Sequence, residues 1–132
     1  MNLIDVYLKT ELFVIKDGLT IPISEFIQSS DSAIYVITAW NPGEARFTLE
    51  KNRQLNNEIE HLLEQEGYEY TRGIGKDPNS KYFEESIFVQ GINQERALEI
   101  GRAYQQAAIF EIKKGTQSVL GCLDNSRVSR NL

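Results

Sequence analysis

The 132-residue sequence has a single cysteine, a single histidine and no long hydrophobic run. Cys122 cannot form a disulfide within the chain, and no cysteine and histidine residues have the spacing of a zinc site. No apolar stretch approaches the roughly 18 residues that a membrane-spanning helix needs. The N-terminal stretch MNLIDVYLKTELF lacks the cationic segment and apolar core of a signal peptide. These absences predict a reduced, cytoplasmic protein with no metal site, no cofactor and no membrane contact.

Basic residues are also scarce, with 14 lysines and arginines against 19 acidic residues and a net charge of −5. Because broad binding to nucleic acid needs a cationic surface, this balance argues against it, although a local basic patch is compatible with the sequence. The content of 41 % hydrophobic and 25 % charged residues is typical of a globular protein. We therefore expect one α+β domain over residues 1–123, followed by a frayed polar tail over residues 124–132.

Hydrophobic patterning predicts an alternation of strands and helices from residue 33 onward. Residues 33–40 (AIYVITAW) are apolar on both faces and rich in β-branched and aromatic side chains, as in a central strand. Thr48 and Asn93 are expected to cap two helices, which end near Glu66 and at residue 106. Further strands are expected over residues 68–74, 86–92, 107–113 and 117–123, with a polar loop over residues 75–85.

The resulting order is β-α-β-β-α-β, with an N-terminal extension and an extra C-terminal strand. This order is typical of the split β-α-β, or ferredoxin-like, architecture. It predicts an α+β fold with a mostly antiparallel sheet and helices on one face. Many unrelated functions share this architecture, so the fold alone names no function.

Two asparagines interrupt the apolar stripe of the first predicted helix. At about 100° per residue, Asn52 and Asn56 share a helix face with Ile59 and Leu63. A buried amide without hydrogen-bond partners costs roughly 1–3 kcal/mol. Two interpretations remain open: the amides tie down the loop of residues 41–43, or this end of the helix opens onto a ligand pocket.

The surroundings of this helix end are suited to a negatively charged group. The helix begins shortly after Trp40 and Asn41, so its first turn lies near the C-terminal end of the central strand. Free N–H groups and the helix dipole favour anions or carboxylates at such an end. Arg53, at the edge of the apolar stripe, is placed to reach the same rim.

Glu84 and Ser86 open the strand that follows the predicted polar loop. If this strand pairs beside the central strand, Glu84 approaches Asn52 or Arg53. The carboxylate would then be either a structural partner of these groups or a base whose partner is a substrate. Two other features predict no chemistry. The glycines of RGIGKDP (residues 72–78) lack the spacing of a phosphate-binding loop and predict a turn-rich loop. Cys122 is predicted to be a small buried residue.

Four segments in order, YVITAWNPG, NRQLN, FEESIFVQGI and YQQAAIF, resemble the DUF3293 family, an uncharacterised bacterial family. The resemblance covers about residues 7–112, and its most specific motif is the Trp-Asn-Pro turn (residues 40–42). Tyr82 stands where the family pattern has a tryptophan. The family has no established activity, so the resemblance implies a set of residues but no function. The positions that match the family pattern are Trp40, Asn41, Pro42, Asn52, Arg53, Asn56, Glu84, Ser86 and Gln106.

Three functions are compatible with these residues. The first is a domain that binds a small polar or anionic ligand between the Trp-Asn-Pro turn and the helix N-terminus. The second is a protein-interaction or regulatory module in which the polar cluster is structural. The third is a small enzyme with Glu84 as acid or base, which ranks last because the sequence shows no nucleophile–base pair. The predicted ligand-binding residues are Trp40, Asn41, Asn52, Arg53, Asn56, Glu84, Ser86 and Gln106.

Overall fold

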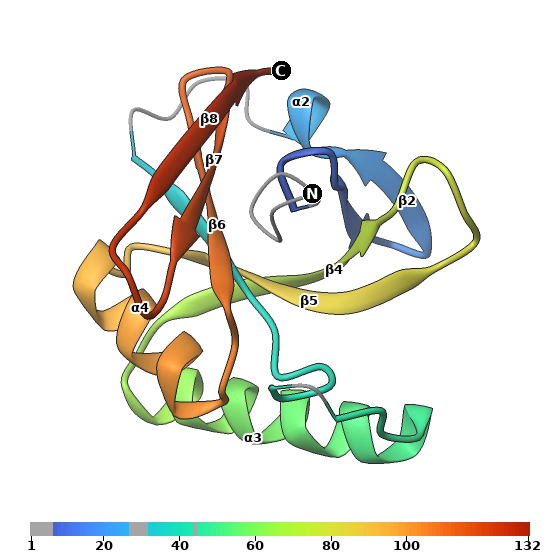
Figure 1. The fold of residues 1–132 in the computed structure, drawn as a ribbon, viewed down its shortest axis with the longest axis vertical. Coiled ribbons are helices and arrows are strands. Elements are labelled where there is room, and N and C mark those ends of the chain that lie inside the picture. Colours follow the sequence, from blue (N-terminus) through green and yellow to red (C-terminus); the bar gives the residue numbers. More distant parts are fainter. Residues whose placement is uncertain (1–6, 27–31, 44) are drawn as a thin grey trace.

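The computed structural model describes residues 7–26, 32–43 and 45–132, and it shows an α+β fold with one curled eight-stranded sheet (Figure 1). No helix in these ranges is long and apolar enough to cross a membrane. The elements are β1 (Glu11–Lys16), β2 (Leu19–Pro22), α2 (Ile23–Phe26), β3 (Ile34–Ile37), α3 (Leu49–Gln65), β4 (Glu69–Lys76), β5 (Phe83–Gln90), α4 (Gln94–Ala103), β6 (Ala108–Lys113), β7 (Thr116–Gly121) and β8 (Arg127–Asn131).

The strands lie in the order β2-β1-β4-β5-β3-β6-β7-β8. Every neighbouring pair is antiparallel, which confirms the predicted α+β class with an antiparallel sheet. β3 lies between β5 and β6, in the middle of the sheet, and all four of its residues are buried. Its apolar character on both faces is therefore explained by burial on both faces.

The N-terminal extension forms a hairpin that lengthens the sheet beyond β4. Asp17 and Gly18 connect β1 to β2 and have φ angles of 53° and 77°. A two-residue turn with two positive φ angles matches the twist of the flanking strands, and an Asp-Gly pair adopts it readily. Because β1 pairs with β4, this hairpin becomes one end of the curled sheet.

The C-terminal residues form a paired strand, so the prediction of a frayed tail is wrong for Arg127–Asn131. This segment is β8, and it pairs with β7 along its whole length. Val128 lies opposite Val119, and the hydroxyls of Ser118 and Ser129 are 2.7 Å apart. The tail contains too few apolar residues to show strand periodicity. It forms a strand because its backbone pairs with β7, which composition does not indicate.

The two faces of the sheet carry separate hydrophobic clusters. Helices α3 and α4 pack on one face, where Ile59 and Ile100 join a cluster that also contains Ile37 and Ile87. The opposite face is concave, and its cluster joins residues of β1, α2, β3, β5 and β6. Alternation along a strand therefore decides whether a side chain faces the helices or the concave side.

Polar contacts join the two ends of the curl. Gln117 Nε2 in β7 donates to the carbonyl oxygen of Thr10, just before β1, at 2.8 Å. Arg130 in β8 donates to the same carbonyl at 3.1 Å. Since β1 and β7–β8 lie far apart in the strand order, these contacts require the sheet to bend around its concave face (Figure 1).

Candidate functional site

The amide of Asn52 is buried and holds the Trp-Asn-Pro turn in place. Its Oδ1 accepts the backbone N–H of Asn41 at 2.8 Å, and its Nδ2 donates to Asn41 Oδ1 at 3.0 Å. Asn41 has a φ of 45°, a left-handed conformation that asparagine tolerates better than most residues. Asn41 Oδ1 also accepts the N–H of Phe47 at 2.9 Å. The helix thus fixes the turn through one pair of side chains.

Asn56, one helical turn after Asn52, also forms side-chain hydrogen bonds with backbone groups outside α3. Its Oδ1 accepts the N–H of Ala39 at 2.7 Å, and its Nδ2 donates to the carbonyl oxygen of Glu85 at 2.9 Å. The side chain therefore joins α3, the end of β3 and the start of β5. Both amides have protein partners, as the first of the two interpretations requires.

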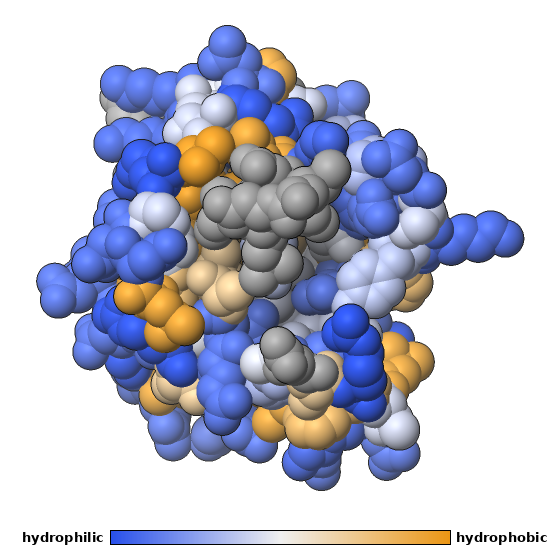
Figure 2. Space-filling model, in the orientation of Figure 1, coloured by the Kyte–Doolittle hydropathy of each residue, from blue (hydrophilic) through white to orange (hydrophobic). Residues whose placement is uncertain are grey.

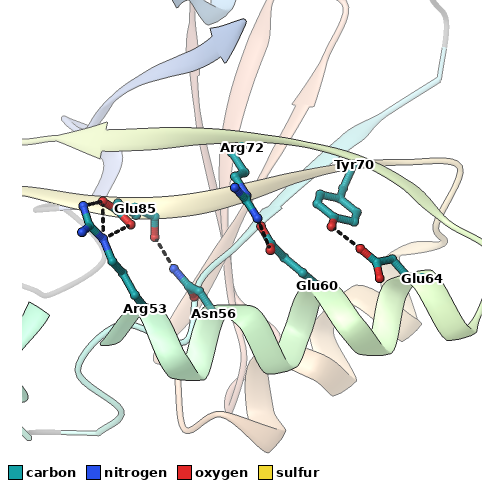
Figure 3. Close-up of polar contacts among 7 residues, drawn as sticks. All are labelled: Arg53, Asn56, Glu60, Glu64, Tyr70, Arg72 and Glu85. Carbon is teal, nitrogen blue, oxygen red and sulfur yellow. Dashed lines mark hydrogen bonds and ion pairs between the residues drawn. The ribbon is translucent and has the colours of Figure 1, made fainter. Parts of the chain in front are cut away.

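Arg53 interacts with Glu85 and not with Glu84, which corrects the expected approach of Glu84 to this arginine. Arg53 Nη2 lies 2.7 Å from Glu85 Oε2, and its Nε donates to the same carboxylate (Figure 3). Neighbours in a strand point to opposite faces, so Glu85 faces α3 and Glu84 faces the concave side. This exposed ion pair is expected to contribute little to stability.

Further pairs continue along α3 toward its C-terminal end. Arg72 of β4 donates two hydrogen bonds to Glu60, at 2.6 and 2.8 Å. The hydroxyl of Tyr70, also in β4, donates to Glu64 at 2.6 Å (Figure 3). Together with the Arg53 pair, these contacts fasten α3 to β4 and β5.

Two adjoining cavities open on the concave side, with volumes of about 500 Å³ and about 950 Å³. We call them together the Glu84 pocket. Hydrophilic residues dominate the surface of the molecule in this view, and hydrophobic residues form smaller separate groups (Figure 2). Apolar groups form more of the wall of the first cavity than polar groups do, and they include the side chains of Val36, Ala108 and Phe110. The residues that line both cavities are Tyr7, Arg46, Tyr82, Glu84 and Gln106.

The predicted site residues divide among three places. Ser86 lines the first cavity, Trp40 and Asn41 line the second, and Glu84 and Gln106 line both. Arg53 and Asn56 line a separate hollow of about 330 Å³ beside Glu85. Asn52 lines none of these cavities and reaches the pocket only through Asn41. The Trp-Asn-Pro turn therefore separates the supporting amides from the pocket that it borders.

Glu84 is the half-buried carboxylate of the pocket. Its Oε2 accepts the hydroxyl of Tyr82 at 2.6 Å, and within the described ranges no residue donates to Oε1. Burial raises the pKa of Glu84, while the Tyr82 hydrogen bond and the charge of Arg46 act in the opposite direction. The pKa of Tyr82 is raised by burial and by Glu84. A carboxyl with a raised pKa in a cavity marks a candidate functional group.

Glu84→Gln is expected to raise the melting temperature at neutral pH. The folded-state pKa of Glu84 lies above its ordinary value of 4.5, so its favourable contribution is fully present below that pH. The free energy of unfolding falls as the pH rises through the folded-state pKa, because the buried carboxyl group then becomes charged. Glutamine stays neutral at every pH, so the variant does not lose this stability. Thermal unfolding from pH 3.5 to pH 7, a range of about 3.5 units that brackets the titration of a carboxyl group, checks the effect. A gap between variant and wild type that widens toward low pH would contradict it.

Two glycines of the expected turn-rich loop belong to a strand, which corrects that expectation. Gly73 and Gly75 lie within β4, opposite Ser86 and Glu84 of β5. A Cβ atom on Gly75 would lie 3.2 Å from Thr10 Cγ2, which belongs to a side chain and not to the backbone. The two glycines therefore leave the C-terminal half of β4 without side chains on the concave face, and Gly75 lines the first cavity.

Several pocket residues were not identified from the sequence. Val36 of β3 and the pair Ala108 and Phe110 of β6 lie on the concave face. Their alternation was visible, but nothing in the sequence showed which of the two faces encloses a cavity. Arg46 lies in the loop before α3, where no periodicity predicts the direction of a side chain.

Two alternative sites receive no support. Cys122 is 1 % exposed, as predicted, and burial raises the pKa of its thiol to about 11, so it is a poor nucleophile. Over the ranges that the structure describes, no group of three or more histidine, cysteine, aspartate or glutamate residues is arranged to hold a metal ion.

The sequence model of the family described as "Protein of unknown function (DUF3293)" matches residues 37–109. The chain belongs to this family. No curated protein and no solved structure matches the chain. The region that matches DUF3293 runs from the end of β3 to the start of β6, so it includes the Trp-Asn-Pro turn, α3, α4 and Glu84. Tyr7 and Phe110, which line the pocket, lie outside it.

Proposed function

We propose that this DUF3293 chain binds a small polar molecule in the Glu84 pocket. The observation that supports this function best is the Glu84 carboxylate, which lies inside a cavity with one oxygen unpaired among the described residues. Burying a charged group is costly unless it has partners, and a ligand would supply them. Cavities of about 300–1,000 Å³ with apolar walls and a few polar groups are typical of small-molecule sites.

The proposed binding surface differs from the helix N-terminus that the sequence favoured. The first turn of α3 already has protein partners, because Thr48 Oγ1 accepts the N–H of Lys51 at 3.1 Å. The turn is held from the other side as well, since Gly43 N–H donates to the carbonyl oxygen of Gln105 at 2.8 Å. In this proposal Asn52 and Asn56 position the rim, while Glu84 contacts the ligand.

An NMR titration tests the proposal with a panel of small carboxylates, amines, amides, nucleosides and amino acids. At least one compound is expected to shift the backbone amide signals of Gly75, Glu84 and Gln106, and to raise the melting temperature. Gly75→Val, which places side-chain atoms in the cavity, is expected to abolish the shifts. Glu69→Gln removes an exposed carboxylate outside the pocket and serves as the control. A panel that shifts none of these signals would refute the proposed function.

An enzyme with Glu84 as general acid or base is the second candidate. The raised pKa of Glu84 and its hydrogen bond from Tyr82 favour it, because a proton-transfer group works best when its pKa lies near the working pH. Conversion of a bound panel compound, lost in Glu84→Gln, would support this candidate. Binding without conversion at any pH would exclude it for that compound.

We also infer that residues 34–113 form the split β-α-β-β-α-β unit expected from the sequence. The central order β4-β5-β3-β6 supports this inference, because β5 separates β3 from β4 and β3 separates β5 from β6. Helix α3 connects β3 to β4, and α4 connects β5 to β6. Both helices pack into the same hydrophobic cluster, as this architecture requires.

A further inference from the structure

We infer that the ligand of the Glu84 pocket is a free amino acid with an apolar side chain. This inference rests on the proposed function and specifies its ligand. An amino acid combines an ammonium group, a carboxylate and a side chain on one small scaffold. Among the residues that the structure describes, the pocket offers acceptor oxygens without a donor, a cation without an ion pair and an apolar wall. Each of these parts matches one part of such a ligand.

Two unpaired acceptor oxygens indicate the place of the ammonium group. Gln106 is 6 % exposed, and its Nε2 donates to the carbonyl oxygens of Trp40 and Tyr104, both at 3.2 Å. The amide is thereby fixed with Oε1 as the atom that no described residue contacts through a hydrogen bond. Glu84 Oε1 is the second such acceptor on the same cavities. An ammonium group has three N–H donors and one positive charge, which satisfy both oxygens.

Arg46 indicates the place of the ligand carboxylate. It lines both cavities, and within the described ranges it makes no ion pair or hydrogen bond. Its positive charge lowers the pKa of Glu84 and of Tyr82, so the guanidinium lies within electrostatic reach of both groups. A guanidinium binds a carboxylate through two parallel hydrogen bonds, which fixes the orientation of the ligand as well as its charge.

One part of the wall of the first cavity is apolar and suits a side chain such as that of leucine or phenylalanine. The rings of Tyr7 and Phe110 pack edge to face, with centroids 6.1 Å apart and an interplanar angle of 82°. Val36 and Ala108 complete this wall, and Gly75 leaves space opposite. Apolar lining predominates there, so burial of the side chain supplies affinity while the charged groups supply orientation.

Other ligand classes match only part of these groups. A nucleotide or phosphate would bring several negative charges next to the Glu84 carboxylate, which is unfavourable at close range. A polyamine would pair with Glu84 but would place further positive charge beside Arg46. The zwitterion is the class in which Glu84 and Arg46, the two charged residues that line both cavities, each meet an opposite charge.

Titration calorimetry with the full chain tests the inference through five probes. L-Phenylalanine and L-leucine are expected to bind, glycine lacks the apolar group, 2-phenylethylamine lacks the carboxylate and 3-phenylpropanoate lacks the ammonium group. Each of the last three is expected to bind at least about tenfold more weakly than L-phenylalanine, which corresponds to about 1.4 kcal/mol. The comparison isolates each part of the zwitterion without altering the protein.

Variants then assign each charge to its partner. Glu84→Gln is expected to weaken the binding of L-phenylalanine at least about tenfold while leaving the affinity for 3-phenylpropanoate unchanged. Arg46→Gln is expected to weaken the binding of L-phenylalanine to a similar degree while leaving the affinity for 2-phenylethylamine unchanged. Glu69→Gln and Lys51→Gln remove the same charges from exposed positions outside the pocket, and their affinities are expected to equal that of the wild type.

The results separate failure of the ligand class from failure of the pocket. If L-phenylalanine and L-leucine do not bind, or if the singly charged probes bind as tightly, the zwitterion inference is wrong. If another compound still shifts the signals of Gly75 and Glu84, the proposed function survives that result. If neither the amino acids nor the wider panel shifts these signals, both the inference and the proposed function fail.

Discussion

Gly73→Ala is expected to lower the free energy of unfolding by roughly 1–3 kcal/mol or more, the usual cost of overpacking a core. A Cβ atom at this position would lie 2.3 Å from the carbonyl oxygen of Phe13 and 2.4 Å from the ring of Phe88. The first contact is with the backbone of β1, which pairs with β4, so neither strand can yield without breaking the sheet register. Urea denaturation, with the midpoint and slope measured together, gives the change.

Gly75→Ala is the matched control for this prediction. Gly75 lies two residues further along β4 and faces the same side of the sheet, but its nearest neighbour would be a side-chain methyl group of Thr10 at 3.2 Å. We expect a stability change within about 0.5 kcal/mol, as for substitutions that disturb no core contact. If the two alanine variants prove equally stable, the close packing of Phe88 against Gly73 is not what requires glycine there.

Asn56→Ala is expected to cost roughly 1–3 kcal/mol, because it leaves the buried N–H of Ala39 without an acceptor and removes one of the two donors to the carbonyl oxygen of Glu85. The N–H of Ala39 loses its acceptor, and the carbonyl oxygen of Glu85 loses a donor. A greater loss than for an ordinary surface asparagine follows because α3, β3 and β5 all meet at this side chain. Thermal and chemical unfolding measure the loss, and hydrogen exchange of the Ala39 amide reports whether the opening is local.

The adjacent asparagine provides the control for Asn56. Asn57 has the same side chain on the same helix, but it is exposed, and Asn57→Ala is expected to change stability by less than about 0.5 kcal/mol. Alanine has a higher helix propensity than asparagine, so propensity cannot cause a loss at either position. A cost for Asn57→Ala equal to that of Asn56→Ala would therefore show that the buried hydrogen bonds do not determine the effect.

Much of the fold was predictable because local patterns and tertiary packing agree. The helix stripe containing Ile59 and Leu63 is buried, and the capping residues Thr48 and Asn93 do cap α3 and α4. The same stripe identified Asn52 and Asn56 as buried amides that need partners, and the structure supplies those partners. Periodicity and hydrogen-bond satisfaction are local constraints, so a single sequence expresses them.

The pairing of charges was not predictable, because it depends on which face of a strand turns toward the helices. Glu84 and Glu85 are adjacent and chemically identical, and a shift of one residue in register exchanges their faces. The pairing of β5 with β3 aligns Ile87 with Ile37, and this register directs Glu85 toward Arg53 and Glu84 toward the concave side. Residue spacing alone contains no information about this choice.

The ends of the sheet bear on how the protein behaves at high concentration. β2 and β8 are the outer strands among the residues described, so within that part of the chain each has one side that no other strand pairs with and that another chain could extend. Both strands are short, with four and five residues. Pro22 also removes a backbone donor from β2. We therefore expect the short outer strands to limit edge-to-edge pairing between copies of the chain.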